Sequence, residues 1–130
     1  MTIDKDAVKA EFIDMLRSTG REGVDYVIEE IERLGFFEAP ASANHHLNVE
    51  GGLTQHSLNV AKSALSVWEA LKPLEPTLEK EVTRDSIIIS ALLHDVCKAD
   101  IYRRTTKKRK NALGIWEDSE GYRLSYKGFP

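Results

Sequence analysis

The chain has 130 residues, which is the size of one domain with one hydrophobic core. Its hydrophobic content of 42% and charged content of 30% are typical of a soluble globular protein, and its net charge of −3 predicts no general attraction to nucleic acid or to an anionic membrane. The apolar runs are too short for a membrane span, the N-terminus has no apolar signal region, and the single cysteine excludes an internal disulfide, so we expect a cytoplasmic protein without membrane contact.

The first half of the chain predicts amphipathic helices. Apolar residues recur at helical spacing over residues 4–18 and again from 22 to 34. Gly35 follows the second pattern directly, and glycine is the residue type that most often follows the last turn of a helix. A longer helix is expected over residues 53–71, followed by a short one between Pro76 and Val82. The side chains expected to form their apolar faces are Val8, Phe12, Met15, Leu16, Val24, Val27, Ile28, Ile31, Leu34, Leu58, Ala61, Leu65 and Trp68, with Val60, Ala64, Val67 and Leu71 beside the stripe of the 53–71 helix.

The segment from 87 to 98 predicts a buried helix, because it is apolar on nearly every helical face. Thr83 or Asp85 is expected to cap it. The helix is nevertheless expected to end in His94 and Asp95, side by side, and burial of ionisable groups is costly without a partner. Two explanations remain open: the pair binds a divalent metal, or the two side chains are satisfied by hydrogen bonds to each other or to the backbone. Cys97 is expected to be a small core residue beside this site.

Three further histidines lie upstream of His94 and Asp95. Gly51 and Gly52 allow close backbone approach where the 53–71 helix begins, so His56 is expected to point inward from its first turn. His45 and His46 precede the glycines and are candidates for metal ligands, outer neighbours of a metal or phosphate contacts. Taken singly, each histidine also fits an ordinary exposed or hydrogen-bonded residue.

The sequence pattern changes after Asp100. Alternating residues predict a small antiparallel β excursion of two or three strands over 101–127, with a turn at 118–121 and with Tyr122, Leu124 and Tyr126 on one face. Six of the eight residues 103–110 are cationic. They fit a contact with a nucleic-acid backbone, and equally a solvated hairpin whose charges discourage edge pairing. Arg103 and Arg104 are the candidate substrate contacts.

The three histidine-containing motifs together are more specific than any one of them alone. His-His, then Gly-Gly-Leu-x-x-His-Ser, then Ala-Leu-Leu-His-Asp-x-x-Lys resembles the HD-domain superfamily of metal-dependent phosphohydrolases over about residues 40–100. The arrangement is most similar to the subgroup that includes 3′–5′ exoribonuclease HD domains and related phage and bacterial hydrolases. The resemblance implies an all-α HD-domain helical bundle, with the β-hairpin excursion near the C-terminus, as a single domain spanning residues 1–130.

The resemblance also implies a site. His56, His94 and Asp95 match the metal ligands, Asp95 and Lys98 match catalytic positions, and His46 or His45 would be an outer neighbour or a phosphate contact. Imidazole and carboxylate donors suit one divalent ion, and the set leaves Mn²⁺, Fe²⁺, Co²⁺, Ni²⁺, Zn²⁺ and Mg²⁺ open. The family has a further Asp on a later helix.

The later Asp of the family has no counterpart in this chain. Asp100 is too near Asp95 in sequence to replace it, and Asp118 falls in the expected turn, so we expect the chain to be the N-terminal part of a longer hydrolase. The implied function is hydrolysis of a phosphoester or phosphoanhydride of a nucleotide or nucleic acid. The alternatives are a catalytically silent module that binds a nucleotide or partner protein, and a relaxase-like DNA-processing protein. The sequence makes no prediction of oligomeric state.

Overall fold

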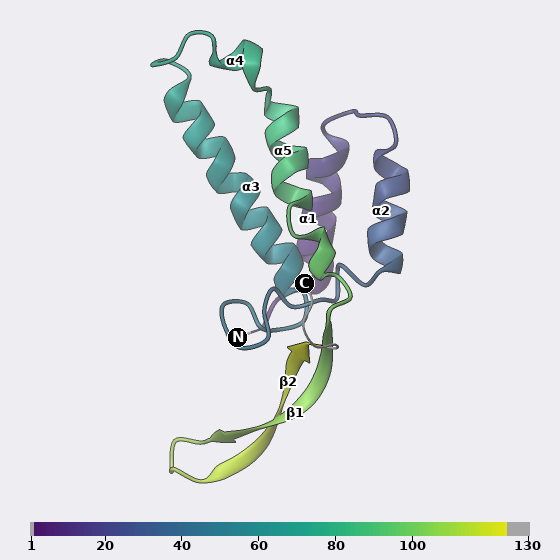
Figure 1. Cartoon of the computed structure of the whole chain (residues 1–130), viewed down its shortest axis with the longest axis vertical. Helices are drawn as coiled ribbons and strands as arrows, with labels where there is room; N and C mark the ends of the chain where they lie inside the picture. The colour runs from purple at the N-terminus through teal and green to yellow at the C-terminus, as the bar shows by residue number, and fades with distance from the viewer. Residues whose placement is uncertain (1, 125–130) are drawn as a thin grey trace.

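The computed structural model describes residues 2–124 as a helical body with a projecting β-hairpin (Figure 1). Expectation and structure agree on helices up to Leu93 and strands only after Asp100, although the 18 strand residues mean that the chain is not all-α. The elements in order are α1 (Lys5–Arg17), α2 (Val24–Arg33), α3 (Gly52–Leu71), α4 (Leu78–Glu81), α5 (Arg84–Leu93), the 3-10 helix η1 (Val96–Lys98), β1 (Tyr102–Lys110) and β2 (Trp116–Leu124).

The helix ends follow the capping chemistry of the sequence. Asp4 caps α1, because its side chain accepts a hydrogen bond of 3.1 Å from the Ala7 amide, and Thr83 caps α5 in the same way. Gly35 follows α2 with a φ of +86°, and the next amide, that of Phe36, donates to the Ile31 carbonyl at 2.9 Å. This is a Schellman-type ending, and it turns Phe36 into the core.

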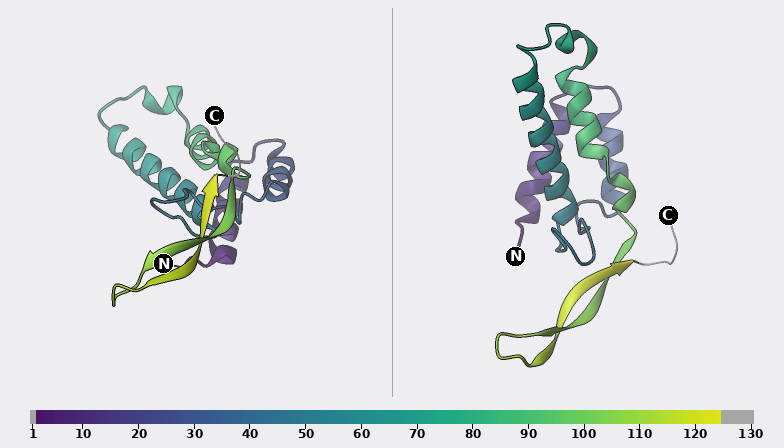
Figure 2. Two further views of the ribbon diagram at one scale, coloured as in Figure 1. Left: turned by 60° about the horizontal axis from the view of Figure 1, so that its bottom comes forward. Right: turned by 60° about the vertical axis from the view of Figure 1, so that its left-hand side comes forward.

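The core lies where α3 and α5 run side by side and α1 crosses behind them (Figures 1 and 2). The rings of Phe12, Phe36 and Phe37 form a cluster with centroids 5.1–5.5 Å apart, in tilted and edge-on arrangements that aromatic pairs prefer. Most side chains of the expected apolar faces are buried or partly buried. The exceptions include Leu34 at the end of α2, which is 37% exposed, and Val67 and Leu71 on α3, which are 58% and 42% exposed.

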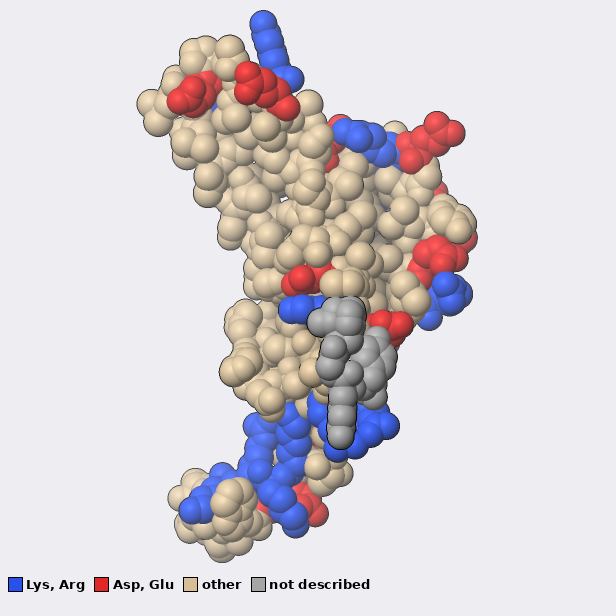
Figure 3. Space-filling view, in the orientation of Figure 1, with Lys and Arg blue, Asp and Glu red and all other residues tan. Residues whose placement is uncertain are grey.

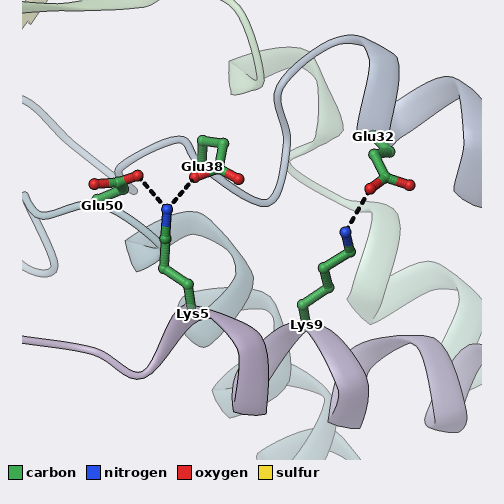
Figure 4. Close-up of polar contacts among 5 residues, drawn as sticks. All are labelled: Lys5, Lys9, Glu32, Glu38 and Glu50. Atoms are coloured by element: carbon green, nitrogen blue, oxygen red, sulfur yellow. Dashed lines mark hydrogen bonds and ion pairs between the residues drawn. The ribbon is translucent and has the colours of Figure 1, made fainter.

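The segment 36–51, which connects α2 to α3, is fastened to α1 at both of its ends (Figure 4). Lys5 donates to Glu38 at 2.6 Å and also to Glu50, and these hydrogen bonds raise the pKa of the lysine. Lys9 pairs with Glu32 one turn further along α1. Exposed ion pairs stabilise little individually, but the two pairs of Lys5 tie the segment that precedes α3 to α1, and the Lys9–Glu32 pair ties α2 to α1.

The expectation that the helix leading to His94 and Asp95 is buried on nearly every face is wrong in part. Ile88 and Leu92 are buried, but Ile89 and Leu93 are only partly covered, because within residues 2–124 α3 and α1 pack against two sides of α5. The helix ends at Leu93 with His94 as its C-cap, so its end at the His94–Asp95 pair is as expected, and the chain continues through a turn into η1. The prediction that Cys97 is a core residue is wrong as well: its position on η1 leaves it exposed.

The hairpin contains two strands joined at residues 111–115 (Figure 2). Asn111 makes the turn, since its Oδ1 accepts from the amides of Leu113 and Ile115 at 2.9 and 3.1 Å, and Gly114 has a φ of +79°. The expected turn at 118–121 is wrong, because those residues lie within β2 and face β1 in register.

Two further observations concern the sequence expectations. Tyr122 is buried and Leu124 exposed on the same face of the hairpin, whereas Tyr126 lies outside the described residues. Of the helices within residues 2–124, none combines the length and the apolar character needed to cross a bilayer.

Candidate metal centre

His56 is positioned by a close backbone contact at the start of α3. A Cβ on Gly52 would lie 2.1 Å from the Leu47 carbonyl oxygen, so only glycine allows this approach. The same carbonyl accepts from the Ala41 amide at 3.0 Å, and the Leu53 amide donates to the Ala39 carbonyl at 2.9 Å. The first turn of α3 is thereby locked to the connecting segment, and His56 lies at the edge of the helix with 29% of its side chain exposed.

His94 caps the C-terminus of α5, and its own helix orients its ring. Its Nδ1 lies 2.6 Å from the Ala91 carbonyl oxygen. A carbonyl oxygen only accepts hydrogen bonds, so Nδ1 must carry the proton, and in the neutral ring the lone pair is then on Nε2. That tautomer is the one that a metal ligand requires, and a hydrogen bond to the second ring nitrogen is the usual way in which proteins fix it.

Three potential ligand atoms converge at the meeting point of α3 and α5. His56 Nε2 lies 3.3 Å from His94 Nε2 and 3.3 Å from Asp95 Oδ2, and His94 Nε2 lies 3.2 Å from the same oxygen. Atoms held about 2.0–2.2 Å from one ion have mutual separations close to these values. Two imidazoles and one carboxylate also match the donors of first-row divalent ions, so both geometry and chemistry fit a metal.

The electrostatic setting favours neutral imidazole at His56. Burial is the largest influence and lowers the pKa of His56, and the positive charges that His94, Lys98 and His46 can carry act in the same direction. The carboxylate of Asp95 opposes them by raising this pKa, but the net shift is downward. Because a metal needs the unprotonated ring, the lowered pKa keeps His56 available as a ligand at neutral pH.

Of the other candidate site residues predicted from the sequence, some lie near the three potential ligand atoms and others do not. Lys98 lies beside the three ligand atoms, with Nζ 3.6 Å from Asp95 Oδ2. His46 is exposed but near enough to influence His56, whereas the structure gives exposed His45 only a backbone hydrogen bond to Ser42. Arg103 and Arg104 follow in β1 and, as neighbours in a strand, point to opposite faces of the hairpin.

Two contributors to the site region carry no local signal in the sequence. The Ala91 carbonyl that orients His94 becomes visible only with the ending of α5 in place. Lys107 crosses from the hairpin to the connecting segment, where its Nζ donates to the Ala43 carbonyl at 3.0 Å and to Asn44 Oδ1 at 2.6 Å. Within residues 2–124, the cluster of potential metal ligands contains neither Asp100 nor Asp118, and Asp118 pairs with Lys108 on the hairpin.

Comparisons with known proteins point in the same direction as the geometry. The family model described as HD domain matches residues 53–125, more than half of the chain. A curated relative, the dihydroneopterin 2′,3′-cyclic phosphate phosphodiesterase of Methanocaldococcus jannaschii, is 48% identical over 67 residues. That alignment covers 52% of this chain and 26% of the relative, so the chain spans about a quarter of the length of the relative. No solved structure matches the chain.

Proposed function

The chain belongs to the HD-domain family, and from that membership we propose that it is a metal-dependent phosphohydrolase acting on a phosphoester or phosphoanhydride of a nucleotide or nucleic acid. The observation that carries the proposal is the set of three ligand atoms, from His56, His94 and Asp95, with mutual distances of 3.2–3.3 Å. The named activity of the relative, cleavage of a cyclic phosphodiester, supports the same reaction class. A cytoplasmic setting is part of the proposal, consistent with the exposed free thiol of Cys97.

In this proposal His56, His94 and Asp95 hold one divalent ion, which is Mn, Fe, Co, Ni, Zn or Mg. Such an ion supplies Lewis acidity: it polarises a phosphoryl oxygen and lowers the pKa of water from about 15.7 to about 7. The Ala91 carbonyl keeps the Nε2 lone pair of His94 directed at the centre. Asp95 uses one carboxylate oxygen in the ligand set, and its other oxygen can accept a hydrogen bond from the attacking water.

Lys98 serves the substrate in this proposal. Its side chain is 35% exposed, and its ammonium group, 3.6 Å from Asp95 Oδ2, is able to approach a phosphate bound at the centre. A fixed positive charge there stabilises the negative charge that develops on the phosphoryl oxygens during transfer. His46 lies further out and is proposed as a phosphate contact, with His45 as the weaker candidate for the same role.

The test is hydrolysis by the full chain loaded with each candidate metal. The substrates are a 2′,3′-cyclic nucleotide, dihydroneopterin 2′,3′-cyclic phosphate, a nucleoside triphosphate and a short oligonucleotide. Asp95→Asn and His94→Ala should abolish turnover, and Lys98→Gln should lower kcat about 10²–10³-fold, as removal of a charge-stabilising group does. Lys80→Gln is the matched control, since Lys80 is exposed on α4 at the far end of the body.

A catalytically silent binding module is the second candidate. The observation that favours it is the three-residue ligand cluster, which contains no second carboxylate from residues 2–124. Stoichiometric metal binding that depends on His56, His94 and Asp95, together with phosphate binding but no turnover of any substrate, would favour this candidate. Metal-dependent turnover that disappears in Asp95→Asn would exclude it.

A further inference from the structure

The hairpin has a charge opposite to that of the rest of the chain. Residues 102–124 contain seven cations and three carboxylates, a net charge of +4 in a chain whose net charge is −3, so the remaining residues have a net charge of −7. Figure 3 shows Lys and Arg gathered over the hairpin, below the helical body. A basic element on an acidic protein attracts anions locally, although the whole chain does not.

The strand register divides these cations between two faces. Alternate residues point to the same face, together with their cross-strand partners. We call one side the open face; it consists of Arg103, Thr105, Lys107 and Arg109 on β1, opposite Arg123, Gly121, Ser119 and Glu117 on β2. We call the other side the paired face; it consists of Tyr102, Arg104, Thr106, Lys108 and Lys110, opposite Leu124, Tyr122, Glu120, Asp118 and Trp116.

The cations of the paired face have partners within the hairpin. Arg104 pairs with Glu120 at 2.9 Å, and Lys108 pairs with Asp118 at 2.9 Å. The third cation of this face, Lys110, lies 5.4 Å above the centre of the Trp116 ring, within the range of a cation–π interaction. The paired face is therefore largely neutralised by its own side chains.

The guanidinium groups of the open face lack such partners. Arg103, Arg109 and Arg123 are exposed, and none of them forms an ion pair with any residue between 2 and 124. Arg103 lies directly opposite Arg123, an arrangement that is unfavourable for like charges. Glu117, opposite Arg109, instead accepts a hydrogen bond from Asn111 at 3.4 Å. An external anion is the partner that would relieve the repulsion on this face.

The open face is connected to the candidate metal centre through Lys107. The lysine side chain passes over Gly121, where a Cβ would lie 2.8 Å from Lys107 Cδ, and it reaches Ala43 and Asn44. The segment that contains these two residues continues through His46 to Leu47, whose carbonyl oxygen packs against Gly52 at the start of the His56 helix. The hairpin is thus fastened to the segment that borders the metal ligands.

We propose that the open face binds the phosphodiester backbone of a single-stranded nucleic acid and guides it toward His56, His94 and Asp95. The binding of nucleic acid by the open face does not depend on the proposed function, but the guidance of the nucleic acid toward the three residues rests on it. Arg103 and Arg123 lie at one end of the open face, and Arg109 lies six residues further along β1, about 20 Å away, so this spread of charge suits a repeating anion better than a single phosphate.

The experiment compares two triple variants with the same loss of charge. The first variant, Arg103→Gln, Arg109→Gln and Arg123→Gln, removes the three arginines of the open face and keeps Lys107. The second variant, Arg104→Gln, Lys108→Gln and Lys110→Gln, removes the three cations of the paired face. Binding of a labelled oligouridylate of about 20 nucleotides is measured by fluorescence anisotropy at several salt concentrations, with EDTA present so that no metal-dependent cleavage occurs. Circular dichroism verifies that each variant is folded.

The open-face variant should bind at least tenfold more weakly at low salt, and its slope of log K against log salt should be shallower by about 2, since each phosphate contact on a single strand contributes about 0.7. The paired-face variant should stay within about threefold of the original protein. A third variant with lysine at the three arginines of the open face should keep the original slope, because the charges remain. Equal losses in both glutamine variants would show attraction by net charge alone and would overturn the proposal.

Two further measurements separate this proposal from others. Binding to phosphatidylserine vesicles that exceeds binding to the oligouridylate would assign the open face to a membrane and overturn the proposal. His94→Ala should bind the oligouridylate as well as the original protein does while hydrolysing nothing. Loss of oligouridylate binding with intact hydrolysis of a small cyclic phosphate would contradict the open-face proposal alone, and intact binding without any hydrolysis would contradict the proposed function alone.

Discussion

His56 Nε2 and His94 Nε2 lie 3.3 Å apart, although 38 positions separate the two residues in the sequence. The contact depends on two backbone features: the Gly52–Leu47 approach that sets the start of α3, and the ending of α5 at Leu93. Two ring nitrogens and the Asp95 carboxylate at this distance form a concentration of acceptor atoms. Such a cluster is stabilised by a bound cation or by a proton shared among its members, and the pH decides which of the two is favoured.

The first prediction concerns the tautomer of His94. Because Nδ1 faces the Ala91 carbonyl oxygen at 2.6 Å, the metal-free protein at pH 8 should carry the ring proton on Nδ1 and leave Nε2 unprotonated. Nitrogen-15 NMR of the imidazole side chains distinguishes the two forms. Exposed His45 is the internal reference, since its ring is not held in the same way. A proton found on His94 Nε2 would contradict the orientation deduced for this ligand.

The second prediction concerns the pH dependence of stability without metal. The pKa of His56 in the folded protein is lowered, chiefly by burial, below the ordinary value of about 6.5 that applies to the unfolded chain. As the pH falls below about 6.5, the unfolded chain therefore binds a proton that the folded protein still rejects, and the free energy of unfolding decreases until the pH reaches the lowered folded pKa. Above the unfolded pKa the contribution of His56 is fully present.

Urea unfolding between pH 8 and pH 5 measures this contribution. His56→Gln should show a smaller loss of stability over the same range, because glutamine does not titrate. His45→Gln is the matched control and should follow the original protein. Metal affinity should fall over the same pH range, since protons compete for the imidazole ligands. An identical pH dependence in His56→Gln and the original protein would show that another group is responsible.

The helices were well predicted because their apolar periodicity is local, and a motif singled out the three residues whose side chains the structure brings together, His56, His94 and Asp95. Prediction from the sequence failed where distant contacts decide. Asp118 to Gly121 has the composition of a turn, but Asp118 and Glu120 pair across the hairpin with Lys108 and Arg104, and Asn111 provides stronger turn chemistry nearby.

That error had a consequence for the site. The position of the turn sets the strand register, and the register decides which face each side chain occupies. The cross-strand neighbours of the two arginines, Arg123 opposite Arg103 and Glu120 paired with Arg104, were therefore beyond the reach of the sequence pattern. The exposure of Cys97 was missed for a similar reason, because it follows from how little of the 94–98 turn is covered by packing within residues 2–124.

The third prediction concerns Gly52. Gly52→Ala places a Cβ 2.1 Å from the Leu47 carbonyl oxygen and 3.2 Å from the Ala41 amide nitrogen, so the start of α3 has to move. We expect a loss of about 1–3 kcal/mol in stability, as for other overpacked positions, and a loss of metal affinity because His56 moves with the helix. Thermal unfolding and calorimetric titration with Mn²⁺ measure the two effects.

Gly114→Ala provides the control for this prediction. Gly114 also has a positive φ, +79°, but a Cβ there meets no atom within 4 Å. It should lose only about 1 kcal/mol from the backbone conformation. Its metal affinity should be unchanged, because the hairpin turn does not position any of the three ligands. If both variants lost metal affinity equally, the contact between Gly52 and Leu47 would not be what positions His56.

The fourth prediction concerns Thr54, which lies two residues before His56 on α3. Its side chain is fully buried, and its hydroxyl has no hydrogen-bond partner among residues 2–124. A buried hydroxyl without a partner costs about 1–3 kcal/mol, whereas a methyl group of the same size in an apolar core does not. Thr54→Val should therefore raise the free energy of unfolding by about 1 kcal/mol, which for a domain of this size corresponds to a rise of about 4 °C in Tm.

Thr54→Ser separates the effect of the buried hydroxyl from the effect of the buried methyl group. It keeps the unpartnered hydroxyl and removes a buried methyl group, so it should lower stability by about 1 kcal/mol instead. Metal affinity should be the same in both variants and in the original protein, since Thr54 faces the core while His56 lies at the edge of the helix. Destabilisation by Thr54→Val, with an unchanged fold by circular dichroism, would instead indicate that the hydroxyl has a partner in solution, such as a buried water.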